Sequence, residues 1–292
     1  MSRRVRAGLA AVVMALLGAC AHRADITTLR TSDAALAAVR SAPDAAGKAG
    51  SAHFEMTIAI DGPTGPYELV ATGGYSDRRL SMQMDLGAAL AQAAAATGET
   101  VPDGVTGPME IVVDGDTTYL RLPSLAAVTG SRSWLAVQAS DLGVATSSIG
   151  VGATDPAQLL ASLRGMSDDI AEVGTEDVRG VPTTHLAGTV EVARALERVP
   201  AAQRGRLEAQ LETLGAAAAG IPVDVWIDAD DLVRRFQIDL SKVVQGSGGG
   251  ARGSATMTLE LFDYGEPVSI TVPDPSETSS YRDVLGALGG QR

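Results

Sequence analysis

Apolar and polar residues alternate along much of the chain after residue 50. In Phe54–Ile60 the even-numbered positions hold phenylalanine, methionine and isoleucine, and the positions between them hold glutamate, threonine and alanine. Successive side chains of a β-strand point to opposite faces of a sheet, so this period of two predicts a strand with one apolar face. Tyr67–Tyr75 and Leu80–Leu86 are predicted strands as well. Breaks at Asp61–Pro63 and Gly65–Pro66 then favour a three-stranded meander.

The same pattern continues toward the end of the chain. Short turn sequences separate the segments, and Asp114-Gly115 is the strongest of these hairpin signals. Strands joined by short turns pair antiparallel, which predicts a mostly antiparallel sheet, and an open sheet of this size tends to curl or split. The further predicted strands are Met109–Val113, Thr117–Leu122, Trp134–Val137, Ile170–Val178, Thr183–Val192, Val223–Ile227, Leu232–Leu240, Ala255–Tyr264 and Val268–Val272.

A few segments between the strands have helical features instead. One is rich in alanine, the residue with the highest helix propensity. Another begins at Asp155-Pro156, an N-cap followed by a residue that the first helical turn tolerates. A third places three leucines on one side of a helix. Such helices can cover the apolar face of a sheet. The predicted helices are Ser32–Val39, Leu86–Thr97, Pro156–Leu163 and Ala201–Leu214.

The first nineteen residues have the features of a bacterial signal peptide. Three arginines precede the apolar run Ala7–Leu17, which is shorter than the roughly 20 residues of a membrane-spanning helix. The run ends in Leu17-Gly18-Ala19-Cys20, which resembles the lipobox of bacterial lipoproteins. Cys20 is the single cysteine of the chain, and we predict that its sulfur carries a diacylglycerol group. The alternative is a free cysteine left after an ordinary signal peptide.

These patterns predict three parts: a signal peptide (1–19), a lipidated N-terminus with a tether (20–50), and a single domain (51–292). Removing residues 1–19 takes away three arginines and no acids, so the formal net charge falls from −12 to −15. A chain this acidic repels nucleic acid and anionic lipid headgroups. We therefore expect no nucleic-acid partner, and attachment to the extracytoplasmic face of the cell membrane through acyl chains.

Residues with catalytic potential are sparse. The chain has three histidines, His22, His53 and His185, and no Gly-x-Ser-x-Gly motif that would mark a hydrolase nucleophile. We interpret the histidines as surface or strand residues. The sequence therefore predicts no catalytic residue and no enzyme.

Metal and phosphate sites are not indicated either. Asp228–Asp231 lacks the glycine and the distal glutamate of a calcium-binding EF-hand loop, so we interpret it as a solvated turn, as we do Asp114–Asp116. Gly246–Gly250 is followed by no lysine and opens no helix, unlike a phosphate-binding loop. The sequence predicts no metal and no cofactor.

Several features in this order resemble a known family, the actinobacterial lipoproteins of the LppX/LprAFG type. More distantly, the chain resembles periplasmic lipoprotein carriers with a LolA/LolB-like fold. The resemblance covers most of the chain after residue 20 and includes no catalytic residue. The features that carry it are the lipobox, the meander His53–Leu86, the hairpin Ile111–Leu122, the segment Glu176–Leu186 with Gly180-Val181-Pro182-Thr183, the segment Val223–Asp228, and the terminal Ile270–Pro275.

The resemblance implies an α+β fold: a strongly curved, mostly antiparallel half-barrel with helices covering its concave face and an apolar cavity between the two layers. The one-sided strands predict which residues would form the cavity wall. Methionine adapts to irregular apolar surfaces, so Met56, Met82, Met84 and Met257 fit either a ligand wall or an ordinary core. The predicted wall residues are Ile58, Ile60, Met82, Met84, Leu86, Ile238, Leu259 and Leu261.

Three functional hypotheses follow. The first is a carrier that binds lipid or lipoglycan acyl chains in an apolar cavity and helps carry them through the cell envelope. The second is a non-enzymatic scaffold or accessory lipoprotein with a filled core, acting through an envelope protein partner or a transporter. The third, an envelope hydrolase, is the weakest because no nucleophile, base and acid can be assembled. Lipid that co-purifies with the protein would discriminate the first two.

Overall fold

The computed structural model describes residues 33–62, 65–77, 79–87, 107–122, 132–138, 170–190, 220–246 and 253–284, with residues 90, 91, 94, 98, 156, 159, 160 and 163. The signal peptide and Cys20 lie outside this part, as do His22 and the predicted helix 201–214. Only fragments of the predicted helices Leu86–Thr97 and Pro156–Leu163 are described; among them, residues 87, 90, 91, 94, 156, 159 and 160 are helical.

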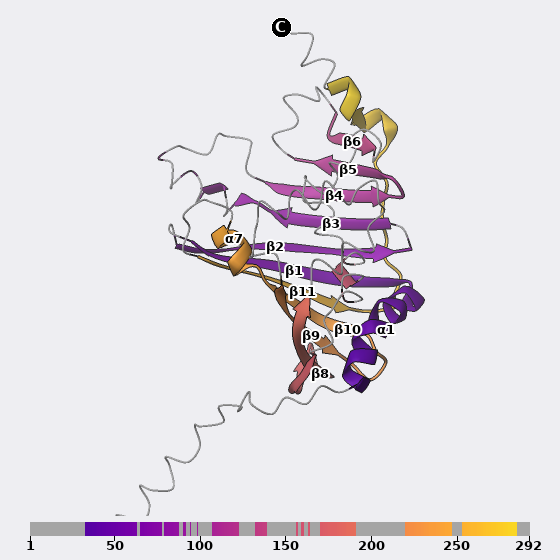
Figure 1. The fold of residues 1–292 in the computed structure, drawn as a ribbon. Coiled ribbons are helices and arrows are strands. Elements are labelled where there is room, and N and C mark those ends of the chain that lie inside the picture. Colours follow the sequence, from indigo (N-terminus) through magenta and orange to yellow (C-terminus); the bar gives the residue numbers. More distant parts are fainter. Residues whose placement is uncertain are drawn as a thin grey trace, which may run out of the picture. The chain divides into compact units, whose positions relative to one another are not determined.

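The described chain is mostly β-structure (Figure 1). The alternating segments form strands because each buries one face and exposes the other. The strands are β1 (Ser51–Gly62), β2 (Gly65–Ser76), β3 (Arg79–Asp85), β4 (Pro108–Asp114), β5 (Thr117–Arg121), β6 (Trp134–Gln138), β7 (Ala171–Val178), β8 (Val181–Val190), β9 (Ile221–Ile227), β10 (Val233–Asp239), β11 (Ser254–Phe262) and β12 (Thr278–Ser280).

All twelve strands belong to one sheet, in the order β12-β6-β5-β4-β3-β2-β1-β11-β10-β9-β8-β7. The chain starts in the middle at β1, runs stepwise to β6, and returns from the far edge at β7 to β11 beside β1. Neighbours pair antiparallel except β12 and β6, which are parallel. The predicted meander and the mostly antiparallel sheet are therefore confirmed.

Two helices accompany the sheet, α1 (Asp33–Ala49) and the short α7 (Ser241–Gly246). The buried side of α1 is formed by Ala35, Val39, Ala42 and Ala46, which join the same apolar cluster as the sheet. Its small side chains let it lie close to β1 and β9. The sequence predicted only the first half of α1, because Pro43 interrupts the backbone hydrogen bonding of an ordinary helix.

The two ends of the strands differ. The turns β2–β3, β4–β5, β7–β8 and β9–β10 all lie at the end where β1 begins, which we call the turn-rich end. At the opposite end lie the β1–β2 connection and α7; we call it the β1–β2 end. In Figure 1, α1 is seen at the first end and α7 at the second.

The segment after β11 differs from expectation. Val268–Val272 was predicted as a strand, but residues 267–274 form no strand and cross the turn-rich end as an extended strap between β11 and β12. The prediction was wrong because alternation of apolar and polar residues shows only that one side of an extended segment is buried. It does not show that a neighbouring strand forms hydrogen bonds with that segment. The strap is held by Ser51, whose hydroxyl donates to Glu266 O at 2.7 Å, and by Gly265 N, which donates to Ser51 O at 3.0 Å.

The sheet is not strongly curled, so the expectation of a strongly curved half-barrel needs correction. Curling a sheet requires repeated bulges or glycine kinks in successive strands. The pairings from β1 through β6 run in continuous register, and shifts occur only at Val233/Arg235 and Glu172/Gly174 in the other half. Ordinary sheet twist remains, and Figure 1 shows β8 and β9 at a steep angle to β1.

Candidate functional site

One face of the sheet is apolar across most of its width. Cross-strand partners share a face, so the register connects the side chains into rows. One row runs Val225, Phe236, Leu259, Met56, Ala71, Met84 and Met109, from β9 to β4. The neighbouring row runs Leu261, Phe54, Gly73, Met82, Ile111, Leu120 and Leu135, from β11 to β6.

The predicted wall residues all lie on strands or strand ends of the described chain, but their burial differs. Met82, Met84, Leu259 and Leu261 are between 0% and 6% exposed. Ile58, Leu86 and Ile238 are partly buried and pack against the same cluster, whereas Ile60 is half-buried near the end of β1. Whether these residues line a cavity for lipid remains a prediction.

The methionines predicted on apolar strand faces are confirmed in place. Met56 is fully buried, and Met82, Met84 and Met257 are at most 6% exposed. Gly73 lies between Phe54 and Met82 in the second row, and a Cβ there would lie 2.7 Å from the Phe54 ring and 2.2 Å from Ser81 O. The absent side chain therefore lets the Phe54 ring lie over β2, and the core is closely packed at this point.

The opposite face carries a polar row along equivalent positions. It runs His185, Trp226, Arg235, Glu260, Glu55, Thr72, Gln83, Glu110 and Arg121, from β8 to β5. In its middle, Glu55 and Glu260 lie directly opposite each other, an arrangement that like charges disfavour. We call this face the polar face.

Arg179 resolves that repulsion. Its Nε donates to Glu260 Oε2 at 2.7 Å, and its Nη2 lies 3.3 Å from Glu55 Oε2. Burial alone lowers the pKa of the Arg179 guanidinium, but the bonds and charges of Glu260 and Glu55 outweigh it, so the pKa is raised. Arg179 is thereby held as a cation between two carboxylates.

The position of Arg179 depends on sheet twist. It lies in the two-residue turn between β7 and β8, where Arg179 and Gly180 both have positive φ, as a type I′ hairpin requires. In a flat sheet β8 would lie about 14 Å from β11. The ion pair with Glu260 therefore shows that twist brings the hairpin turn over the polar side of β10 and β11. A second ion pair, Arg235 to Glu176 at 2.6 Å, joins β10 to β7.

Trp226 is buried on this polar face. Its indole stacks on the His185 ring at 4.2 Å between centroids, and the Arg235 guanidinium lies 5.1 Å from its centre. His185 Nε2 in turn lies 2.7 Å from Asp224 Oδ1. Trp134 on β6 has a similar setting, with Arg121 above its ring and Glu110 paired to Arg121. The two tryptophans thus lie on the polar face, on β9 and β6, and each has an arginine over its ring.

The described histidines lie in strands as predicted, but the turn Asp228–Asp231 is only partly solvated, because the Asp228 side chain is 5% exposed. His53 and His185 lie in strands, and neither hydrogen-bonds a serine, threonine or tyrosine hydroxyl within the described residues. Asp228 closes the β9–β10 turn, accepting from the N–H groups of Asp230 and Leu232, and pairs with Arg234 at 2.6 Å. No cluster of three or more metal-ligating side chains occurs among the residues that the structure describes.

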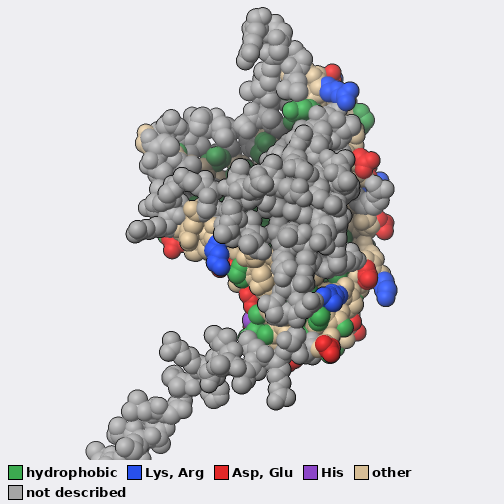
Figure 2. Space-filling view, viewed as in Figure 1, with side chains coloured by type: hydrophobic (Ala, Val, Ile, Leu, Met, Phe, Trp, Pro, Cys, Tyr) green, Lys and Arg blue, Asp and Glu red, His purple; other side chains and the backbone are tan. Residues whose placement is uncertain are grey.

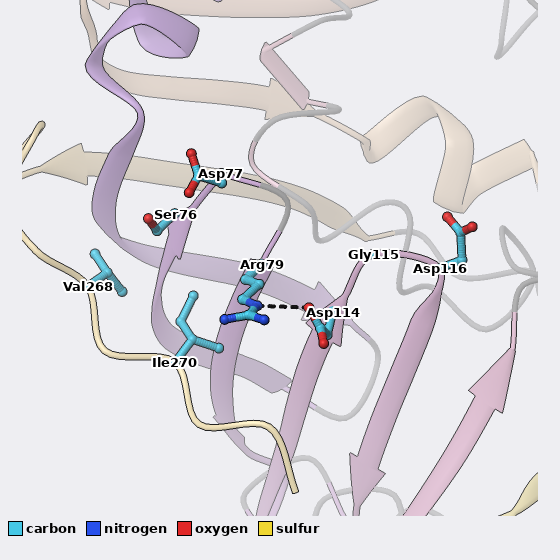
Figure 3. Close-up of a pocket in the computed structure, with 8 residues that line it drawn as sticks. All are labelled: Ser76, Asp77, Arg79, Asp114, Gly115, Asp116, Val268 and Ile270. Atoms are coloured by element: carbon cyan, nitrogen blue, oxygen red, sulfur yellow. Dashed lines mark hydrogen bonds and ion pairs between the residues drawn. The ribbon is translucent and has the colours of Figure 1, made fainter.

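A surface hollow of about 470 Å³ lies at the turn-rich end (Figure 3). The β2–β3 and β4–β5 turns form one side and the strap forms the other, through Val268 and Ile270. Arg79 crosses its floor and donates to Asp114 Oδ1 at 2.8 Å, which raises the pKa of Arg79. With Asp77 and Asp116 on its rim, the hollow is acidic and unsuited to acyl chains.

Sequence reasoning missed the Arg179 network. Gly180 after Arg179 marks a hairpin turn, and that signal was available. The contacts of Arg179 on β1 and β11 depend on how far the sheet twists, which no local pattern encodes.

Among the described helices, none is long and apolar enough to cross a membrane.

The chain has relatives in Streptomyces, and no protein-family model matches it. An uncharacterized 31.2 kDa protein of Streptomyces griseus is 31% identical over 203 residues, covering 65% of this chain and 63% of that protein. The match thus spans less than two thirds of the relative's length. A Streptomyces coelicolor protein whose name describes it as a lipoprotein is 27% identical over 274 residues, covering 86% of this chain and 77% of that protein.

The chain is structurally similar to LprF, to LppX and to proteins of the LolA superfamily, as the resemblance predicted. LprF from Mycobacterium bovis is 15% identical, with a TM-score of 0.45 over 83% of this chain and 98% of that chain. LppX from Mycobacterium tuberculosis is 22% identical, with a TM-score of 0.43 over 82% and 100%. A LolA-superfamily protein of Nitrosomonas europaea is 9% identical, with a TM-score of 0.26 over 83% and 96%.

Proposed function

We propose that this protein is a lipid-anchored envelope lipoprotein that holds lipid or lipoglycan acyl chains against the apolar face of its sheet. The observation that carries the proposal is the breadth of that face, whose two rows each cross seven strands. Acyl chains need few polar partners, so such a face suits them better than a polar substrate.

The helical cover described so far supports the proposal. The buried side of α1 consists of three alanines and one valine, which carry little side-chain volume. Apolar space between such a helix and the sheet would stay dry and admit apolar guests. Transfer from a bilayer exchanges one apolar environment for another. The favourable free energy of keeping acyl chains out of water, about 0.8 kcal/mol per buried CH₂, is therefore largely retained in the pocket.

The lipid anchor rests on separate support. The Leu17–Cys20 sequence provides the acceptor cysteine, and the Streptomyces coelicolor relative is described as a lipoprotein. An envelope transporter is a partner consistent with this location. We propose no catalytic step for any residue of this chain.

The second candidate is a scaffold with a filled core. It is favoured by the close packing of Phe54, Met56, Phe236 and Leu259, each at most 1% exposed. In that case the apolar face would be satisfied by the chain's own side chains, and the protein would act through a protein partner.

Two matched substitutions separate the candidates. Met84 lies beside the small Ala71, whereas Leu259 lies between Phe236 and Met56. If a cavity exists beside Met84, Met84→Trp should fill it, lower lipid binding at least tenfold and leave the unfolding temperature nearly unchanged. Leu259→Trp is the overpacking control and should cost about 1–3 kcal/mol of stability.

The measurements are mass spectrometry of lipid extracted from the purified mature chain and thermal unfolding of each variant. Lipid on the wild-type protein and less on Met84→Trp supports the carrier. No lipid on the wild type, together with strong destabilisation by both substitutions, would establish the filled core instead.

A further inference from the structure

The apolar face is not equally buried along its strands. On β1, Phe54 and Met56 are at most 1% exposed, whereas Ile58 and Ile60 are half-buried. On β2, the corresponding neighbours of Ile58 and Ile60 are Leu69 and Tyr67, which are half-buried as well, although Ala71 is fully buried. Burial therefore decreases toward the β1–β2 end.

The same change occurs on the other side of β1. On β10, Phe236 is fully buried, and Ile238, one step closer to the β1–β2 end, is only partly buried. Ile238 pairs with Met257, which pairs with Ile58, so two half-buried isoleucines lie on either side of Met257, which is itself only 6% exposed. These residues lie on the face that also carries the buried core.

The turn-rich end is closed by comparison. Val39 and Ala42 of α1 are fully buried against the cluster, and the helix ends at Ala49 immediately before β1. The strap crosses the polar side of the same end, where Val268 lies over Gly74. Apolar chains entering there would first have to displace α1.

Exposed carboxylates are more numerous at the turn-rich end. Seven exposed carboxylates lie in the turns of the turn-rich end, among the residues that the structure describes, and Figure 2 shows acidic side chains along that edge. The described β1–β2 end carries four, Asp61, Glu68, Asp85 and Asp239, with Lys242 near Asp239. Exposed Lys48, Arg79 and Arg179 lie at the turn-rich end too, so the two described ends differ little in net charge. The seven carboxylates are Asp77, Asp116, Asp177, Asp230, Asp231, Asp263 and Glu266.

We propose that the β1–β2 end is the surface that meets the lipid bilayer, and that acyl chains enter and leave the apolar layer between Ile58, Ile60 and Ile238. The inference rests on the proposed carrier function and names the route of its ligand. Contact between the bilayer and these partly buried isoleucines spares the acyl chain a passage through water, which is unfavourable for every exposed CH₂.

Fluorescent labels at the two ends test the route. In the mature chain carrying Cys20→Ser, Asp61→Cys and Asp116→Cys place a single thiol at the β1–β2 end or the turn-rich end. Both positions are exposed, so neither substitution disturbs the core. Each protein is labelled with a polarity-sensitive fluorophore and titrated with phosphatidylcholine vesicles, with and without phosphatidylglycerol and with brominated acyl chains as quenchers.

We expect the label at residue 61 to shift to shorter wavelength and to be quenched by brominated lipid, while the label at residue 116 stays unchanged. An equal or larger response at residue 116, or none at either position, would overturn the proposal. Lipid extraction from the vesicles is measured in parallel. If lipid is extracted but the label at residue 61 does not respond, the carrier function stands and the route is refuted. If the label at residue 61 shifts but no lipid is extracted, the carrier function is refuted and the β1–β2 end is still the membrane-contacting surface.

Discussion

Val268 of the strap occupies the space above Gly74 on β2. A Cβ at Gly74 would lie 2.7 Å from Val268 Cγ1, closer than real Cβ atoms approach other heavy atoms, and 3.3 Å from the backbone oxygen of Ala52. The contact ties the strap to the polar side of the sheet at the turn-rich end. Because β12 follows the strap, this contact also helps to place β12 beside β6, at the edge of the sheet.

Gly74→Ala should therefore lower the free energy of unfolding by about 1–3 kcal/mol, the usual cost of overpacking. Gly47→Ala is the matched control, because a Cβ at Gly47 meets nothing within 4 Å. Gly47 lies inside α1, so its replacement should stabilise the protein by up to about 1 kcal/mol. Denaturant unfolding of both variants checks the pair.

Val268→Ala provides the rescue. In that background the added methyl group at residue 74 has room, so Gly74→Ala should cost less than in the wild type. A double-mutant cycle measures this coupling. If Gly74→Ala lowers the free energy of unfolding equally in the two backgrounds, Val268 is not what excludes a side chain at residue 74.

The ion pairs of Arg179 should contribute a salt-dependent part of stability. Arg179→Ala leaves Glu55 opposite Glu260 without the cation between them, so we expect a loss of about 1 kcal/mol at low ionic strength that shrinks as salt is added. The arginine side chain is 38% exposed, and solvent screening therefore limits the effect. Unfolding measured across a salt series checks it.

Glu55→Gln is the compensating change. It removes one of the two facing carboxylates, so in the Arg179→Ala background it should restore part of the lost stability. In the wild type the same change should be neutral or mildly destabilising. If Glu55→Gln gives no recovery, repulsion between Glu55 and Glu260 is not the cause of the loss.

The attachment of β12 should weaken in acid. Asp274 Oδ1 accepts from the Ser276 hydroxyl at 2.6 Å and from the Ser276 N–H at 2.8 Å; these bonds lower the pKa of Asp274 below its ordinary value of 3.8. A lowered carboxyl pKa stabilises the folded state above the ordinary value, and this contribution is lost as the pH falls through the lowered pKa. The protection of the Thr278–Ser280 amides, taken relative to the intrinsic exchange rate at each pH, should therefore fall below about pH 4.

Asp274→Asn separates this carboxyl from the others. The amide oxygen can still accept from Ser276 but does not titrate, so the acid-dependent step in the exchange of Thr278–Ser280 should disappear. An unchanged step in the variant would assign the acid sensitivity to another carboxyl, of which Asp239 is the first to test because its pKa is also lowered by Ser241.

Cys20→Ser should abolish lipid attachment. The substitution keeps the size of the side chain but removes the sulfur that would form the thioether. In a bacterial host, metabolic labelling with a fatty-acid analogue should mark the wild-type protein and leave the variant unmarked, with unprocessed precursor accumulating. Equal labelling of the two proteins would contradict the lipobox interpretation.

Local pattern was enough to find nearly every strand. Phe54, Met56 and Leu259 alternate with polar residues because one face is buried and the other is not, and that difference is visible in the sequence. Two errors show the limits of predicting strands from alternation. Val268–Val272 alternates without a neighbouring strand, and the strand Thr278–Ser280 lacks an apolar pattern because it is short and lies at an edge.

The candidate site was predicted in part. The apolar face could be assigned residue by residue, since burial on one face is a local property. The position of β1 at the centre of the sheet and the contacts of Arg179 on β1 and β11 depend on long-range order and twist, which no single segment contains. The same holds for the fall in burial from Met56 to Ile60, because it reflects what covers each position.

The central place of β1 has a consequence for how the chain acquires its structure. β1 pairs on one side with β2, its neighbour in the chain, and on the other with β11, where His53 meets Phe262. Apart from β12, the strands of each half pair with their neighbours in the chain, so these pairings can form early, but the seam between the halves closes only after almost the whole chain is available. Until then β1 and β11 present unpaired edges to other chains, so an incompletely folded molecule is most prone to aggregation at this seam, and a chaperone or a dilute compartment would favour correct closure.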